Sequence, residues 1–437
     1  MNRLYIHLAF FAIRRRKWVI GCWLLFAAFS LPLAAKLPDV LGDHGLVTDG
    51  LHRKALARME QEFGIPAEPV LMLFESAQEM PAENIYGAIT QLLQRADRIS
   101  GVDVAASPLL QSELQAGSFA YAVLSVPESI KERRRAVEQL RGLAAESSDG
   151  LKVYVTGKPV VQEDVNRSSR EDLSAAEMLG VPVAFAIMLL TFGGALSSLI
   201  PLLAGGIAVA VAMAAVWFAG AYGNVPLSVF VYNVIPMTGM AVCLDFALLM
   251  VSRFREEKAS HSLCAAVCRT MATSGKSVTV SAVCAAAALA GTFFIRMPIF
   301  NTVALGALMV LGVSALLNLT LVPAMLYAWG DRIRPLSTDD GRARKRWDAW
   351  IAGMMKRPGR TVLLSMSVLL LLLIPVREMR VSIPGPGSLS PDTPSRIAAE
   401  RIDGIRHAPY VSEVYFVAEG REKAAELRSE LLARGNT

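Results

Sequence analysis

Charged residues are scarce in this chain: they make up 19% of its 437 residues, against about 25% in an average soluble domain. The scarcity is local, because several stretches of roughly 18–25 residues carry almost no charge. A helix of that length crosses the hydrocarbon core of a bilayer, which is about 30 Å thick. The composition therefore indicates a membrane protein and excludes an ordinary soluble globular domain.

Cysteine and the motifs of enzyme sites are also sparse. The chain has five cysteines, and none lies in the long polar segment 36–176, so no disulfide framework is expected there. Cys264 and Cys268 share a helix face, but no second Cys or His pair follows at ligand spacing. The sequence has no Ser-His-Asp set, metal cluster or Walker phosphate loop. We therefore expect a protein that is not an enzyme and that holds no metal or bound cofactor.

Basic residues exceed acidic ones, giving a net charge of +6, but they cluster beside the apolar stretches. That placement is typical of membrane topology, so we expect the lipid bilayer, and no nucleic acid, as a partner. We interpret seven stretches as candidate spans, namely 18–35, 177–193, 197–221, 226–251, 277–295, 300–329 and 361–376.

The distribution of the basic residues also predicts the orientation. The N-terminal tail, the loop after the fourth span and the loop 330–360 are rich in Lys and Arg, whereas 221–225 has neither. Positively charged loops stay inside the cell. The pattern therefore predicts a multi-pass protein of the inner (cytoplasmic) membrane with a cytoplasmic N-terminus, and it places 36–176 outside the cytoplasm.

The outer segment 36–176 has the pattern of a small α/β domain. Apolar and alternating runs predict strands, and amphipathic stretches predict helices, in the β-α-β-β-α-β order of the ferredoxin-like arrangement. An additional helix over 51–63 precedes this order. The strands are expected at 68–76, 102–106, 118–126 and 151–156, and the helices at 82–99 and 128–145.

A similar pattern restarts after the seventh span, where Ile383-Pro384 corresponds to Leu37-Pro38 of the first copy. The second copy predicts a helix at 395–406, a strand at 411–418 and a helix at 421–433. Internal repeats of this kind are typical of duplicated transporters. We divide the chain into a cytoplasmic tail (1–17), a first span (18–35), an outer α/β domain (36–176), a bundle of five spans (177–329), a basic cytoplasmic loop (330–360), a seventh span (361–376) and the truncated start of a second outer domain (377–437).

Asp245 lies in the middle of an apolar helix, eight residues before Arg253. At 1.5 Å per residue, it is about 12 Å from the cytoplasmic end of the helix and near the middle of the bilayer. A charge at this depth costs about 2.5–3.5 kcal/mol on insertion scales, and loss of hydration favours the protonated carboxyl group. We therefore expect Asp245 to handle protons; the alternative is a structural hydrogen bond between helices.

Hydroxyl groups near Asp245 are candidate partners. Thr238 lies on the same face of its helix, and Ser277 and Ser281 share a face of the next span, from which either can donate a hydrogen bond. The competing interpretation is that each serine bonds the carbonyl four residues earlier in its own helix. We expect a proton relay of Asp245, Ser281 and Ser277, with Thr238 beside it.

The stretch from Asp245 to Glu257, DFALLMVSRFREE, resembles the fourth-span signature of the mycobacterial membrane protein large (MMPL) family of the RND superfamily. The family pattern is close to G-x-D-Y-x-L-F-x-x-x-R-x-R-E-E. The segment 274–283 resembles the start of the family's fifth span, 315–334 the end of its sixth, and 157–164 (GKPVVQED) the exit from its porter domain. The similarity covers essentially the whole chain.

Two residues depart from the family pattern. Phe246 stands beside Asp245 where the family usually has Tyr, so one hydroxyl of the family's relay is missing, and Cys243 replaces a Gly. Family members also resemble two similar halves with about twelve spans and a second Asp-Tyr pair. The chain ends before that second pair, and we expect it to be incomplete as a single chain.

The resemblance implies a fold and a function. The fold would be a membrane α-helical bundle of about seven spans with an extracytoplasmic ferredoxin-like porter domain. The function would be proton-motive-force-driven export of lipids or hydrophobic compounds, with protons as the coupling ion and a second transporter half or a homo-oligomer as partner. A non-transporting regulatory or accessory subunit, and an inactive fragment of such a transporter, are the alternatives.

Overall fold

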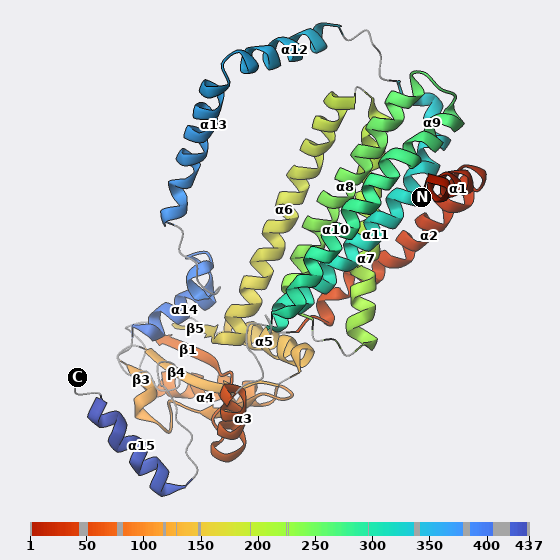
Figure 1. Cartoon of the computed structure of the whole chain (residues 1–437). Coiled ribbons are helices and arrows are strands. Elements are labelled where there is room, and N and C mark those ends of the chain that lie inside the picture. Colours follow the sequence, from red (N-terminus) through yellow and green to blue (C-terminus); the bar gives the residue numbers. More distant parts are fainter. Residues whose placement is uncertain are drawn as a thin grey trace. The chain divides into compact units, whose positions relative to one another are not determined.

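A computed structural model of the chain shows two compact units, which we describe separately (Figure 1). The membrane unit comprises residues 1–45 and 174–383, and the sheet unit comprises 46–173 and 384–437. The structure describes residues 2–42, 51–76, 82–116, 119–127, 129–146, 150–192, 194–223, 225, 227–295, 297–335, 341–378, 385–404 and 420–434.

Six helical segments in the described chain are long and apolar enough to cross a membrane. They are α2 (Arg16–Ala35), α6 (Lys158–Phe192), α7 (Ala195–Tyr222), α8 (Phe230–Lys258), the continuous segment Leu263–Phe294 and α11 (Pro298–Ala328). The segment Leu263–Phe294 is made of α9 (Leu263–Thr270), a π-helical turn η3 (Met271–Gly275), α10 (Lys276–Ala290) and a 3-10 turn η4 (Gly291–Phe294).

These helices confirm a multi-span helical bundle, although several boundaries differ from the predicted ones. Helix α6 begins at Lys158 rather than at 177, and α8 ends at Lys258 rather than at 251. The fifth predicted span was expected to begin at 277, but the helix already begins at Leu263, because the π-helical turn continues it without a break. The last apolar helix, α13 (Pro358–Leu373), has 16 residues and is shorter than the other six. A seventh crossing at this helix stays a prediction.

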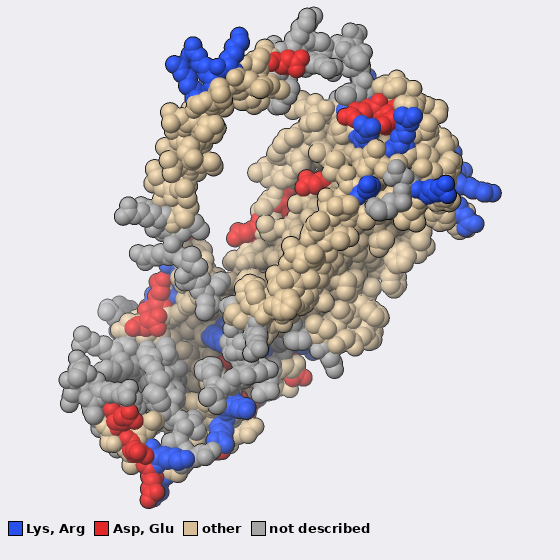
Figure 2. All heavy atoms as spheres, in the orientation of Figure 1, with Lys and Arg blue, Asp and Glu red and all other residues tan. Residues whose placement is uncertain are grey.

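Helices α7, α8 and α11 form the centre of the bundle, where glycines allow the backbones to approach closely. A Cβ at Gly239 of α8 would lie 2.4 Å from a methyl of Val310 on α11, and one at Gly205 of α7 would lie 2.6 Å from the Met240 sulfur. Small residues at helix contacts serve this purpose in membranes. Helices α2, α6 and α10 expose most of their side chains, and Figure 2 shows that much of the bundle surface is uncharged.

Two further helices and two 3-10 turns lie in the described part of the membrane unit. The N-terminal tail contains α1 (Asn2–Arg14), which packs against α9, η3 and α11. The basic segment after α11 contains the 3-10 turn η5 (Gly330–Arg332) and α12 (Gly341–Lys356), and a 3-10 turn η6 (Pro375–Glu378) follows α13.

The sheet unit contains a small antiparallel sheet with strand order β2-β4-β1-β5, to which the short β3 adds by pairing with β4. Four strands lie where the sequence predicted them, namely β1 (Val70–Ser76), β2 (Asp103–Ala106), β4 (Phe119–Ser125) and β5 (Leu151–Thr156). The short β3 (Gln115–Ala116) was not predicted. The helices of the sheet unit are α3 (Leu51–Phe63), α4 (Ala82–Asp97), α5 (Ile130–Ala145), α14 (Pro394–Asp403) and α15 (Arg421–Arg434). Short 3-10 turns lie at Ser112–Leu114 and Pro386–Ser388 in this unit, and another lies at Leu37–Asp39 in the membrane unit.

Both faces of this sheet are buried, as alternate residues of β1 show. Val70, Met72 and Phe74 pack with α4 and α5 in one core, whereas Leu71 and Leu73 pack in a second core on the other face. Successive side chains of a strand point to opposite faces, so each face requires its own cover.

Helix α14 covers the second face, which the sequence did not predict. Ala398 and Ile402 are fully buried in the same cluster as Leu73 and Tyr121 of the sheet. The sequence assigned this helix, at 395–406, to the start of a second outer domain. The strand expected at 411–418 lies outside the described residues, and the division of the chain into outer domains stays a prediction.

Polar contacts fasten α14 in place. Thr156 Oγ1 donates a hydrogen bond to the Ser395 carbonyl oxygen at 2.8 Å, and Ser395 Oγ donates to Asp164 Oδ2 at 2.5 Å. The Arg401 guanidinium pairs with Glu75 and lies 5.4 Å from the ring centre of Tyr154. The partners of α14 lie at Glu75 and within 154–164, so the contacts join segments more than 200 residues apart in the chain.

Candidate functional site

Helix α8 carries Asp245, and its two faces have different surroundings. One face is buried in the core of the bundle and includes Cys243, Phe246 and Ala247. The other face is exposed at every third or fourth residue, as one side of a helix requires. We call this face the α8 stripe; its members are Met237, Ala241, Asp245, Leu248, Leu249 and Ser252.

Asp245 therefore lies near the midpoint of α8 but faces away from the core of the described bundle. Its depth in the membrane stays a prediction. The direction of its side chain is new information, because helical periodicity does not say which face meets the core when the helix is apolar all round.

The two candidate serines are also exposed and lie on α10. Ser277 Oγ donates a hydrogen bond to the Thr273 carbonyl oxygen at 3.4 Å, which is the competing local interaction considered from the sequence. Helix α10 packs mainly against α11, and within the described residues no hydrogen bond joins Asp245 to Ser277 or Ser281. The relay stays a prediction.

Phe246 and Thr238 have different surroundings from Asp245. The Phe246 ring is buried in the bundle core, so a tyrosine there would bury its hydroxyl, at a cost of roughly 1–3 kcal/mol if that group found no partner. Thr238 is half-buried and lies about 10 Å from Asp245 along the helix, which is too far for a direct hydrogen bond.

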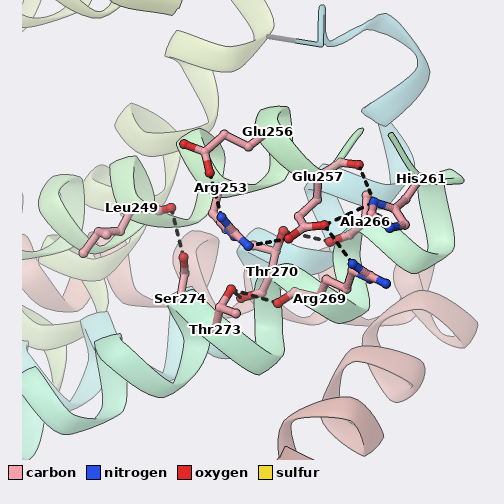
Figure 3. Close-up of polar contacts among 10 residues, drawn as sticks. All are labelled: Leu249, Arg253, Glu256, Glu257, His261, Ala266, Arg269, Thr270, Thr273 and Ser274. Atoms are coloured by element: carbon pink, nitrogen blue, oxygen red, sulfur yellow. Dashed lines mark hydrogen bonds and ion pairs between the residues drawn. The ribbon is translucent and has the colours of Figure 1, made fainter. Parts of the chain in front are cut away.

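A second set of polar side chains lies at the end of α8, where Glu257 is almost fully buried (Figure 3). Its carboxylate accepts a hydrogen bond from Arg253 at 2.5 Å and lies 3.2 Å from His261 Nδ1 and 3.7 Å from Arg269. We call these four residues the α8 end cluster. Arg269 belongs to α9, so the cluster joins the two helices.

The π-helical turn η3 lies beside this cluster and makes its own contact with α8. Ser274 Oγ donates a hydrogen bond to the Leu249 carbonyl oxygen at 3.3 Å (Figure 3). A π-helical turn inserts one extra residue into a helix and is frequent at functional sites. Here the turn itself contacts α8 at Leu249, one helical turn after Asp245.

The remaining cations of this motif hold the end of α11. Arg255 Nε donates to the Arg334 carbonyl oxygen at 3.1 Å, and Lys258 Nζ donates to the carbonyl oxygens of Gly330 at 2.5 Å and Ile333 at 2.6 Å. Carbonyls after a helix C-terminus have no intrahelical partner, so cations stabilise them. The sequence RFREEK therefore fixes α8 to both α9 and α11.

Sequence reasoning assigned these arginines to topology and to the family motif, and it missed the cluster. The signal was present in the spacing, since Arg253, Glu257 and His261 follow one another at intervals of four residues. The contribution of Arg269 depends on the packing of α9 and has no local signal.

Glu257→Gln should lower the thermal stability of the protein in detergent, by about 1–3 kcal/mol, because the buried anion shared by two arginines is lost. The loss is smaller than for a fully buried ion pair, because Arg253 and Arg269 are partly exposed to solvent. Glu256→Gln is the matched control: Glu256 also pairs with Arg253, but it is exposed, and its loss should change stability by less than about 0.5 kcal/mol. The measurement is the midpoint of thermal unfolding by fluorescence-detected size exclusion, and equal shifts would contradict the structural role of the cluster.

The sheet unit contains a cavity of about 600 Å³ between α5, β5, the start of α6 and the segment before α14. Its wall contains the ion pair of Arg141 and Asp164, whose atoms are 2.6 Å apart, together with Arg167 and Glu171. Gly157 lies at the turn into α6 with φ +110°, and a Cβ there would lie 2.4 Å from the Pro69 carbonyl oxygen. The segment 157–164 thus requires glycine at its first position for steric reasons.

Comparison with known proteins gives a family match. Residues 50–361 match the model of the MMPL family. The chain is 26% identical over 387 residues to the mycolic acid-containing lipids exporter MmpL11 of Mycolicibacterium smegmatis, covering 84% of this chain and 40% of that protein. It is 24% identical over 386 residues to the heme uptake protein MmpL11 of Mycobacterium tuberculosis strain H37Rv, covering 82% and 39%.

A third relative is the trehalose monomycolate exporter MmpL3 of Mycobacterium tuberculosis strain CDC 1551, with 25% identity over 319 residues, covering 65% of this chain and 34% of that protein. The chain thus spans about two fifths or less of the length of the curated relatives it matches. The residues matched to the family model include the strands of the sheet unit and the α8 stripe, but not α14.

Proposed function

Since the chain belongs to the MMPL family, we propose that it is part of an exporter of lipids or other hydrophobic compounds that is driven by the proton-motive force. Asp245 takes up and releases the coupling proton in this proposal. Two of the relatives are named as lipid exporters, and this supports the substrate class. The alternative is a non-transporting accessory subunit built on the same helices.

The observation that carries the proposal is the exposed position of Asp245 in the middle of an apolar helix. An ionised carboxylate facing lipid at this depth costs about 2.5–3.5 kcal/mol or more. A second helical bundle packed on the α8 stripe would supply hydrogen-bond partners and remove that cost. If that bundle packed on α8 in two ways, and Asp245 had a different proton affinity in each, proton flow would be coupled to a conformational change.

The partner bundle in this proposal is a second transporter half or a second copy of the chain. The α8 stripe is lined with apolar and small side chains such as Met237 and Ala241, which permit close helix contact. Ser277 and Ser281 are exposed on α10 and are available to the same partner. They would join the relay through that bundle rather than by bonding Asp245 directly.

We further propose that the sheet unit is a ferredoxin-like porter domain outside the cytoplasm. Its support is the strand order β2-β4-β1-β5, with α4 joining β1 to β2 and α5 joining β4 to β5, so that the connections follow the split β-α-β pattern. Both helices pack on the same face of the sheet.

The orientation of this proposal has a direct test. In a background without the native cysteines, Gln139→Cys on the exposed face of α5 should react with a membrane-impermeant maleimide in intact cells. Lys356→Cys, exposed at the end of the basic helix α12, should react only after the membrane is permeabilised. The opposite labelling pattern would reverse the orientation and remove the cytoplasmic N-terminus from the proposal.

The function itself is tested by measuring efflux from cells that express the chain together with the second transporter half encoded in the same genome. A fluorescent lipid and a hydrophobic dye should leave the cells faster than in a vector control, and a protonophore should abolish the difference. Efflux that a protonophore does not change would contradict proton coupling. Equal efflux with and without the chain would favour the accessory subunit.

A further inference from the structure

The N-terminal helix α1 is fixed to the bundle by one face only. Tyr5, Ala9 and Ala12 are buried and pack against η3, α9 and α11. The Tyr5 ring lies next to Gly275 of the π-helical turn, where an added Cβ would lie 3.6 Å from the ring. The short side chains on this face allow α1 to lie close against the ends of the spanning helices.

The opposite face of α1 combines exposed apolar and basic side chains. Leu4, Phe10 and Phe11 are each more than half exposed, at 63%, 54% and 52%. Arg3 and Arg14 are exposed on the same side of the helix, between Phe10 on one flank and Leu4 and Phe11 on the other. An apolar surface divided by a row of cations suits the boundary between lipid headgroups and acyl chains.

The position of α1 in the chain fits that boundary. The spanning helix α2 begins at Arg16, directly after a non-helical residue, Arg15, with φ −108° and ψ 24°. Trp18 at the start of the span is 81% exposed, and the Arg16 guanidinium lies 5.0 Å from the ring centre of Tyr327 at the end of α11. Tryptophan and tyrosine concentrate at membrane–water interfaces. Figure 2 shows Lys and Arg side chains gathered where Figure 1 places α1.

We propose that the outer face of α1, together with the exposed Arg15 that follows it, is a binding surface for anionic phospholipids. Arg3, Arg14 and Arg15 contact the lipid phosphates, and Phe10 and Phe11 lie in the acyl boundary. Charge complementarity identifies the ligand, because basic side chains beside a membrane are attracted to its anionic lipids. The bound lipid holds α1 against η3 and α9, the segment that carries Arg269 of the α8 end cluster. This inference requires only that α2 spans the bilayer and is independent of the proposed transport.

The test uses the full chain in nanodiscs or detergent and measures binding of spin-labelled phosphatidylglycerol and spin-labelled phosphatidylcholine. The parent protein should prefer phosphatidylglycerol, and Arg3→Gln/Arg14→Gln/Arg15→Gln should lower that preference by about tenfold or more. The matched control is Lys356→Gln/Arg357→Gln/Arg360→Gln, which removes three exposed cations beside another apolar helix, α13, and should leave most of the preference intact.

Two further experiments separate the contribution of apolar contact from that of charge. Phe10→Ala/Phe11→Ala should weaken the binding of both lipids alike, because this variant removes apolar contact and no charge. Inorganic phosphate and glycerol phosphate at millimolar concentration should not displace the lipid, because the surface needs the acyl boundary. All substituted side chains are exposed, and size exclusion checks the fold of each variant. An equal loss of preference in both triple variants, displacement by free phosphate, or no preference in the parent would each overturn the proposal.

Discussion

Asp245→Asn should reduce protonophore-sensitive efflux by the assembled transporter to background, a loss of at least about 100-fold. Asparagine has nearly the same size as aspartate and still forms hydrogen bonds, but it cannot take up a proton. The expected result follows from the position of Asp245 on the exposed α8 stripe, where few groups of the described bundle depend on its side chain. The variant should therefore reach the membrane at the level of the parent protein, and efflux is compared at matched membrane levels.

Two variants make this result specific. Met237→Asn places an amide on the same α8 stripe without removing a carboxylate, and it should keep most of the proton-coupled efflux. Ser281→Ala should give a milder loss than Asp245→Asn, because a water molecule can replace one hydroxyl. Unchanged efflux by Asp245→Asn would remove this residue from the mechanism, and an equal loss by Met237→Asn would assign the effect to helix packing.

Ala398→Asp should detach α14 from the sheet and destabilise the sheet unit by about 3 kcal/mol or more. Ala398 is fully buried against Leu73 and Tyr121, so an aspartate there would place an unpaired charge in an apolar core. The chain avoids this cost by undocking α14, which exposes the apolar face of the sheet. Hydrogen exchange of the 394–403 segment is the direct measurement, and it should accelerate to the rate of an unprotected helix.

The neighbouring residue supplies the control. Ala399→Asp introduces the same side chain one position later, where α14 is partly exposed, and it should cost at most about 0.7 kcal/mol in helix propensity. Protection of α14 should be retained. Equal exchange in the two variants would show that α14 does not depend on the sheet for its stability.

The docking of α14 also affects the expected solubility of an isolated outer domain. A fragment of residues 46–173 lacks the cover of Leu71, Leu73 and Val123, which the structure buries under α14. Exposed apolar patches of this kind promote aggregation. The core on this face of the sheet therefore requires residues from both 46–173 and 384–437.

Local sequence determined the elements. Apolar length identified the spanning helices, and the alternation of apolar residues identified the strands of the sheet at the positions where they lie. These signals are contained within some ten to twenty neighbouring residues, because hydrophobic periodicity and span length are properties of a single helix or strand. The same reasoning identified Asp245 as a carboxylate in the middle of a span and Ser277 as a residue able to bond its own helix.

Tertiary structure alone decided which surfaces meet. Helix α14 belongs by sequence pattern to a second repeat, yet Ser395 contacts Asp164 and Thr156, because the uncovered face of the sheet needs an apolar partner and α14 supplies one. Likewise α8 is apolar on all sides, so only its packing against α7 and α11 fixed Phe246 inward and Asp245 outward. The pattern of apolar residues along one helix indicates that a surface must be covered. Only the packing of the other helices determines which element covers it.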